Sequence, residues 1–228
     1  MAYRIFLLLG WVCIMPLAAQ NESLRQLAER HGRYIGAAVG GPFWNDEQQY
    51  IETLKREFNV LVAENNMKFQ ATEPQRGQFR WSNADRLADF AGANGMRLRG
   101  HCLLWHQALP GWVSGGSFGR GEMLDIMRTH IDSVAGRYRG RVWQWDVVNE
   151  AIDDGSGFLR NTVWRERIGD DYLDSAFTFA RRADPEALLF YNEYGAEGLG
   201  AKSDKVYDLV RGMLELLHTG EHDARGES

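Results

Sequence analysis

Trp143-Gln144-Trp145-Asp146-Val147-Val148-Asn149-Glu150 is the stretch that decides the fold. It is apolar and aromatic until it ends in an amide and a carboxylate, so it predicts a strand that carries two polar side chains at its carboxyl end. The strand extends over 141–148. Other apolar runs of strand length, bounded by polar residues, occupy 34–39, 59–63, 96–104 and 187–191.

Amphipathic stretches typical of helices alternate with these five runs. They cover 22–31, 46–57, 82–94, 121–139, 171–183 and 202–217, and Ser82 is expected to cap the third of them. Strands that alternate with helices predict a parallel sheet, either open and doubly wound or closed into a barrel.

A barrel is the interpretation that the polar residues favour. Gly115 and Gly116 follow Trp112 and do not connect a strand to a helix, so the sequence lacks the glycine-rich phosphate loop of nucleotide-binding sheets. Instead, polar and aromatic residues gather where the strands end, which in a TIM-type (β/α)8 barrel is the catalytic rim. A closed barrel has eight strands, and five are countable here.

Composition is typical of a folded enzyme-sized domain. Of 228 residues, 44% are hydrophobic and 25% are charged. Lys and Arg total 26 against 31 Asp and Glu, so the net charge is 26 − 31 = −5. A chain without an excess of positive charge is not expected to bind nucleic acid or an anionic membrane surface.

The first 19 residues are typical of a secretory signal peptide. Arg4 precedes an apolar run over 5–15, and Ala18-Ala19 supplies small residues for cleavage. A buried N-terminal helix is the alternative, although the run has no polar face. Export would leave Cys102 as a single thiol and place the protein outside the cell or in the periplasm. A catalytic domain over 20–218 and a solvated tail over 219–228 complete the expected organisation.

Glu150 is the candidate proton donor. A carboxyl group that acts as a general acid needs a raised pKa, and aromatic neighbours provide the low-dielectric surroundings that raise it. Asn149 beside it can donate a hydrogen bond to a substrate hydroxyl. The alternative, that Glu150 is a surface residue opening a loop, is equally compatible with the pattern alone.

His101 and Trp105 form the second candidate group, within His101-Cys102-Leu103-Leu104-Trp105-His106. On a strand, residues four apart face the same side and residues five apart face opposite sides, which disfavours a metal site made by His101 and His106. An imidazole and an indole suit sugar hydroxyls and sugar rings, but both are also common in cores.

Glu64-Asn65-Asn66-Met67-Lys68 follows the second strand with donors and acceptors that suit a ligand rich in hydroxyl groups. A structural ion pair between Glu64 and Lys68 is the alternative interpretation. Asn192-Glu193-Tyr194 after the fifth strand is either a further set of such groups or a turn.

Together these motifs resemble glycoside hydrolase family 10, the retaining endo-β-1,4-xylanases. The resemblance includes Leu109-Pro110-Gly111-Trp112, Thr72-Glu73-Pro74 and Phe79-Arg80-Trp81, and it extends to about Leu217. It implies an eight-stranded βα barrel that acts on xylan without a cofactor or metal. It also implies that Glu150 is the acid/base, and that the substrate-binding residues are Glu64, Asn65, Lys68, His101, Trp105 and Asn149.

Two departures from the family pattern stand out. Ala108 occupies a position where many members carry Gln, and Gln107 is its neighbour. The family's nucleophilic Glu comes from the seventh strand, so we expect this chain to supply no nucleophile and to be a fragment of the catalytic domain. Other retaining β-glycanases, such as cellulases or mannanases, and a noncatalytic carbohydrate-binding protein are the alternative functions.

Overall fold

The computed structural model describes residues 22–155 and 157–219. The predicted signal peptide over 1–19 therefore lies outside the described residues, as does the predicted tail apart from Thr219, which ends the last helix.

Five strands form one parallel sheet, as the sequence predicts, and their order is β1-β2-β3-β4-β5. They are β1 (Gly36–Val39), β2 (Val60–Ala63), β3 (Arg97–Trp105), β4 (Val142–Asn149) and β5 (Leu188–Asn192). The register pairs Gly100 of β3 with Trp145 of β4, and Asn149 of β4 with Asn192 of β5. Parallel neighbours in chain order, each joined by a helical connection, are the arrangement of successive units in a βα barrel.

All six predicted helices are present, as α1 (Leu24–Arg30), α3 (Gln48–Glu57), α5 (Ser82–Ala93), α7 (Arg120–Arg137), α9 (Tyr172–Ala183) and α10 (Ala201–Thr219). Four short helices were not predicted: α2 (Gly41–Trp44), α4 (Phe69–Thr72), α6 (Gly111–Ser114) and α8 (Val163–Ile168). Each has only four to six residues, which is too short to show a helical period in the sequence.

The expected cap of α5 is wrong. Ser82 is the first helical residue, and Trp81 occupies the capping position without a side-chain hydrogen bond. A capping side chain must precede the first turn, so a serine inside that turn cannot fill the role. Ser23, by contrast, caps α1 by accepting from the backbone N–H of Gln26 at 3.2 Å, and the side chain of Gln26 accepts in return from the N–H of Ser23.

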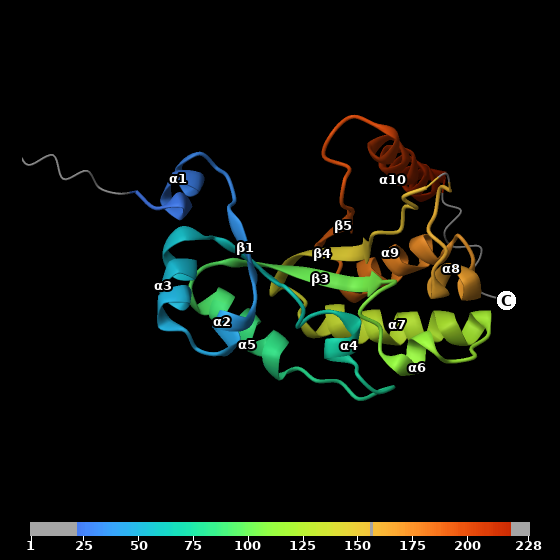
Figure 1. Ribbon diagram of the computed structural model, residues 1–228, viewed down its shortest axis with the longest axis horizontal. Helices are drawn as coiled ribbons and strands as arrows, with labels where there is room; N and C mark the ends of the chain where they lie inside the picture. Colours follow the sequence, from blue (N-terminus) through green and yellow to red (C-terminus); the bar gives the residue numbers. More distant parts are fainter. Residues whose placement is uncertain (1–21, 156, 220–228) are drawn as a thin grey trace, which may run out of the picture.

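Helices α5, α7 and α9 pack against the sheet and cover the core (Figure 1). α5 contacts β2 and β3, α7 contacts β3 and α9, and α9 contacts β4 and β5. Within the sheet, Gly100 lies against the fully buried ring of Trp145. A Cβ atom at Gly100 would lie 2.1 Å from that ring, so this close approach of β3 and β4 requires glycine.

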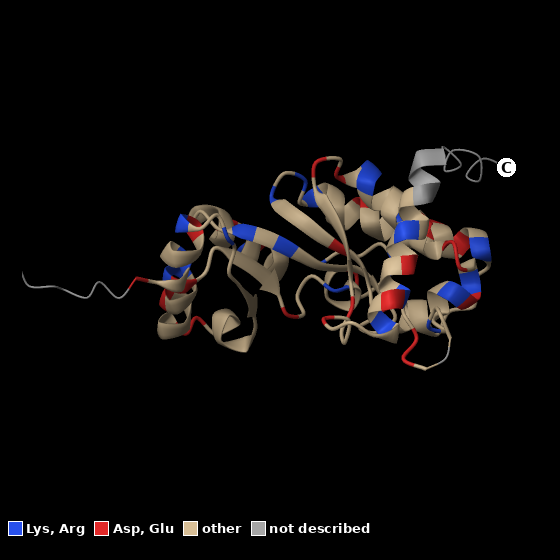
Figure 2. Ribbon diagram, turned by 90° about the horizontal axis from the view of Figure 1, so that it is seen from above, with Lys and Arg blue, Asp and Glu red and all other residues tan. Residues whose placement is uncertain are grey.

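Within the described residues, β1 and β5 are the edges of the sheet. The side chains of Leu188 and Phe190 on β5 are 47% and 40% exposed. Basic and acidic residues are interspersed over the helices (Figure 2), and several pair between elements, as Arg120 does with Asp171. In the described part of the chain, no helix is both long and apolar enough to cross a membrane.

Candidate active site

All of the predicted site residues except His101 lie at or beyond the carboxyl ends of three adjacent strands, and His101 lies in the middle of β3. Glu64 directly follows β2, Trp105 is the last residue of β3, and Asn149 is the last residue of β4 with Glu150 next to it. Because the strands are parallel, these ends meet at one edge of the sheet, which is the edge where βα barrels carry their active sites.

A continuous row of contacts joins four of these residues. The ammonium group of Lys68 donates to Asn65 Oδ1 at 3.0 Å and lies 4.8 Å from the centre of the Trp105 ring. The indole Nε1 of Trp105 donates to Glu150 Oε2 at 3.0 Å. Thus a cation, an aromatic face and the candidate proton donor lie side by side.

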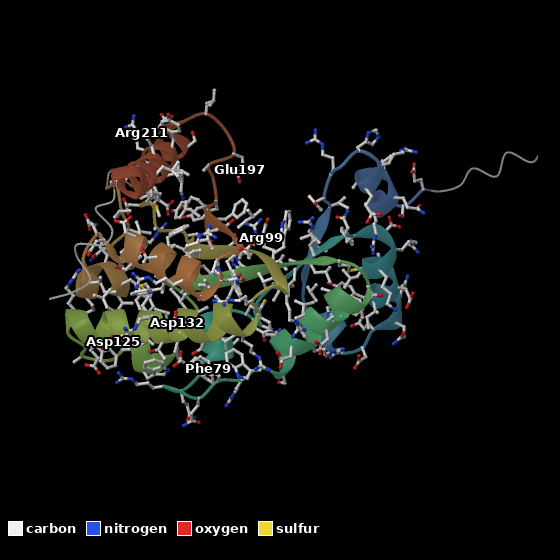
Figure 3. All side chains as sticks on the ribbon, turned by 180° about the vertical axis from the view of Figure 1, so that it is seen from behind. Phe79, Arg99, Asp125, Asp132, Glu197 and Arg211 are labelled. Atoms are coloured by element: carbon white, nitrogen blue, oxygen red, sulfur yellow. The ribbon has the colours of Figure 1, made fainter. Side chains whose placement is uncertain are left out.

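His101 and Asn149 belong to a second network, centred on Asp146. The side chain of Asp146 is 2% exposed, and its Oδ2 lies 2.9 Å from His101 Nδ1. Arg99, labelled in Figure 3, donates from Nε to both carboxylate oxygens of Asp146 at 3.0 Å. Arg99 also donates to Asn192 Oδ1 at 3.2 Å, and Asn192 Nδ2 donates to Asn149 Oδ1 at 2.7 Å. These bonds hold both residues along β3 and β4.

Glu64 is not part of either network. Its side chain is exposed and lies beside Gly40, where a Cβ atom would come within 2.4 Å of Glu64 Oε2. The alternative of a structural ion pair between Glu64 and Lys68 is wrong among the described residues, because Lys68 is directed to Asn65 and Trp105 instead. Within the part of the chain that the structure describes, no side chain forms a hydrogen bond or ion pair with the Glu64 carboxylate at the rim.

The segment after β3 contains the residues where the chain departs from the family pattern. Gln107 Nε2 lies 3.4 Å from His106 Nε2, and Ala108 has a positive φ of 51° while its carbonyl accepts from the N–H of Gln70. Burial, and next the positive charge of Arg160, lower the pKa of His106. His106 is thus biased toward its neutral form.

Four residues that were not among the predicted substrate-binding or catalytic residues support the site: Asp146, Arg160, Tyr191 and Glu193. Asp146 could have been found from the sequence, since an ionisable residue within an apolar strand must be paired when it is buried. Glu193 belongs to the segment that the sequence offered either as further hydrogen-bonding groups or as a turn. Arg160 and Tyr191 gave no such signal, because they come from a loop and from the end of a strand.

A hollow among the described residues lies elsewhere. It has a volume of about 390 Å³ and is lined mainly by residues of β1, β2 and the start of β4, such as Trp143, and none of the predicted site residues borders it. Among the described residues, no group of three or more His, Cys, Asp or Glu side chains could hold a metal ion. The carboxylate, amide, ammonium and indole groups at the carboxyl edge suit proton transfer and the binding of hydroxyl groups.

Comparison with known proteins matches this chain to glycoside hydrolases in both sequence and fold. The family model described as Glycosyl hydrolase family 10 matches residues 23–217. Endo-1,4-beta-xylanase B of Thermotoga neapolitana is 40% identical over 213 residues, which cover 92% of this chain and 61% of that protein. Endo-1,4-beta-xylanase 1 of Humicola insolens is 44% identical over 201 residues, which cover 87% of this chain and 47% of that protein.

Solved structures agree with the sequence relatives. The crystal structure of native xylanase 10B from Thermotoga maritima is 42% identical with a TM-score of 0.82, covering 85% of this chain and 60% of that one. The crystal structure of xylanase 10B from Thermotoga petrophila RKU-1 in complex with xylobiose is 42% identical with a TM-score of 0.83, and the match covers 86% of this chain and 60% of that one. The chain spans about 60% of the length of these Thermotoga relatives. By its sequence and its fold, the chain belongs to glycosyl hydrolase family 10.

Proposed function

We propose that this chain supplies the acid/base half of a retaining endo-β-1,4-xylanase acting on xylan. The observation that carries the proposal is the position of Glu150, at the carboxyl end of β4, with Asn149 beside it and the Trp105 indole donating to its carboxylate. Relatives described as endo-1,4-beta-xylanases, and one bound to xylobiose, support xylan as the substrate class.

In this proposal Glu150 acts twice. As a general acid it protonates the oxygen of the leaving sugar while a second carboxylate attacks the anomeric carbon. As a general base it then takes a proton from water, which releases the sugar with its anomeric configuration retained. The two carboxyl groups of a retaining enzyme are about 5–5.5 Å apart. We place the second one on a later strand of the barrel, outside the five strands of this sheet.

The substrate-binding residues have a common chemistry. Lys68 and Asn65 offer hydrogen bonds to sugar hydroxyls, and Trp105 offers an aromatic face. His101, whose Nδ1 is engaged with Asp146, keeps Nε2 for a hydroxyl. Glu64 and Asn149 add further hydrogen-bonding groups at the same edge of the sheet. No step of the mechanism uses a cofactor or a metal.

The test replaces Glu150 by Gln in a barrel completed with the last three βα units of a Thermotoga relative. Hydrolysis of xylosides with poor leaving groups should fall by about 10²–10⁴-fold, while xylosides with good leaving groups lose far less, because only the former need an acid. Equal losses on both substrates would refute the assignment. Release of reducing sugar from xylan, but not from cellulose or mannan, separates a xylanase from other β-glycanases.

We also propose that the protein is exported after removal of residues 1–19. The support is the sequence pattern of Arg4, the apolar run and Ala18-Ala19. N-terminal sequencing of the secreted protein should begin near residue 20, and material that still starts at Met1 would contradict this. Binding of xylan without hydrolysis by the completed barrel would instead indicate a noncatalytic carbohydrate-binding protein.

A further inference from the structure

The backbone at Glu150 is in an unusual conformation. Its φ is +55°, in the left-handed region that a residue with a side chain adopts only when its surroundings impose it. The strand ends one residue earlier, at Asn149, so regular sheet pairing does not extend past this point. Other contacts must therefore hold the backbone that carries the candidate acid/base.

Every backbone polar group of residues 150–152 has a partner. The N–H of Glu150 donates to the carbonyl of Asn192 at 2.9 Å, and the carbonyl of Ala151 accepts from the N–H of Arg160 at 2.7 Å. The Arg160 side chain donates to the carbonyl oxygens of Glu150 at 3.2 Å and Ile152 at 3.1 Å. The remaining two N–H groups converge on one atom.

That atom is the hydroxyl oxygen of Tyr191. It accepts from the N–H of Ala151 at 2.9 Å and from the N–H of Ile152 at 3.1 Å. A hydroxyl group has one proton and two lone pairs, so two incoming N–H bonds use all its acceptor capacity. Its own proton must then go elsewhere, and it goes to Glu193 Oε2 at 2.5 Å.

Glu193 fixes the direction of that proton. Its side chain is 2% exposed, accepts also from the N–H of Ile152 at 3.2 Å, and pairs with Lys202 at 3.2 Å. Burial and the hydrogen bond to Glu193 both raise the pKa of Tyr191, so the hydroxyl keeps its proton. A protonated tyrosine that donates to a fixed carboxylate presents both lone pairs to the loop after β4.

From this geometry we propose that Tyr191, oriented by Glu193, is a positioning residue for Glu150. It holds the two residues that follow Glu150 and so keeps the carboxyl group against the Trp105 indole. The inference rests on the proposed function, in which Glu150 transfers the proton. In the loop after β4, Tyr191 and Glu193 form hydrogen bonds with the backbone N–H groups of Ala151 and Ile152, and they also bond to each other. Their effect on the Glu150 carboxylate therefore passes through the backbone.

The test reads the position of Glu150 without turnover, so its outcome does not depend on whether the enzyme hydrolyses xylan. The Nε1–H signal of Trp105 in the ¹⁵N-labelled full chain, assigned by its loss in Trp105→Phe, reports the hydrogen bond to Glu150 and should move in Glu150→Gln. Tyr191→Phe should move the same signal, and the amides of Ala151 and Ile152 should exchange with solvent about tenfold faster.

Tyr138→Phe is the matched control. Tyr138 is a buried tyrosine whose hydroxyl also donates to a carboxylate, that of Asp85 at 3.0 Å, so its loss should leave the Trp105 signal unchanged. If Tyr191→Phe does not fold, Glu193→Gln replaces it and should shift the signal in a folded chain. The proposal would be overturned if Glu150→Gln leaves the Trp105 indole signal unchanged. It would also be overturned if both Tyr191→Phe and Glu193→Gln leave that signal unchanged.

Discussion

Lowering the pH below about 6.5 should destabilise the fold through His130, a buried residue of α7. His130 is fully buried on α7, with Nδ1 at 2.9 Å from Glu73 Oε2 and its ring stacked on Phe69 at a centroid distance of 3.5 Å. Burial lowers the pKa of His130, although the hydrogen bond to Glu73 opposes that effect. The folded protein therefore takes up this proton less readily than the unfolded chain does.

The sign and size of the effect follow from that difference. Above about pH 6.5 the histidine is neutral in both states, so it gives no pH dependence; as the pH falls, only the unfolded chain gains the proton. If the folded form stays neutral to pH 5, the free energy of unfolding falls by about 2 kcal/mol between pH 7 and pH 5 from this one group.

Urea unfolding at both pH values measures this loss, and His130→Gln isolates it. Glutamine keeps a donor for Glu73 but does not titrate, so the variant should be less stable than the wild type at pH 7 by about 1 kcal/mol for the lost ring stacking. At pH 5 the gap should close or reverse. Equal pH dependence in the two proteins would refute the reasoning, because the carboxylates common to both would then explain all of it.

Three further outcomes are expected from urea unfolding. Gly100→Ala should lower the free energy of unfolding by about 3 kcal/mol or more, because the new Cβ atom collides with Trp145. Gly92→Ala, in the exposed part of α5, should raise the free energy of unfolding by about 0.5–1 kcal/mol. Equal effects of the two substitutions would contradict the packing at Gly100. Ser23→Ala should lower the free energy of unfolding by about 1 kcal/mol, because α1 loses its N-terminal cap. An unchanged free energy of unfolding would contradict the capping box. Asp146→Ala should lower the free energy of unfolding by about 3–5 kcal/mol, because Arg99 and His101 would lose their carboxylate partner. A decrease of less than about 1 kcal/mol would show that these ion pairs are not needed for stability.

The order of strands and long helices was predictable because each has a pattern of its own. The run over 141–148 became β4 (Val142–Asn149), and the amphipathic stretch over 171–183 became α9. The four short helices were not predictable, because a single turn buries too few residues to leave a period. Ser82 shows a different limit: the residue types around a helix start were right for a cap, but the backbone became helical one residue too early.

Most of the candidate site was also predictable, since Trp105, Asn149 and Glu150 stand at strand ends. The supporting contacts were not. Tyr191 reads as an ordinary apolar strand residue and Glu193 as part of a turn, and only the register of β4 against β5 brings them to the loop after Glu150. Such pairing depends on three-dimensional neighbours that single-sequence patterns do not encode.

The simple order of the sheet has a consequence for biosynthesis. Among residues 22–155 and 157–219, each strand from β1 to β5 pairs with its neighbours in chain order. Each strand from β2 to β5 therefore finds one partner already made when it leaves the ribosome. The part of the domain described by this sheet can thus assemble in the order of translation, one βα unit at a time, and a pause between units leaves no earlier strand committed to a wrong neighbour.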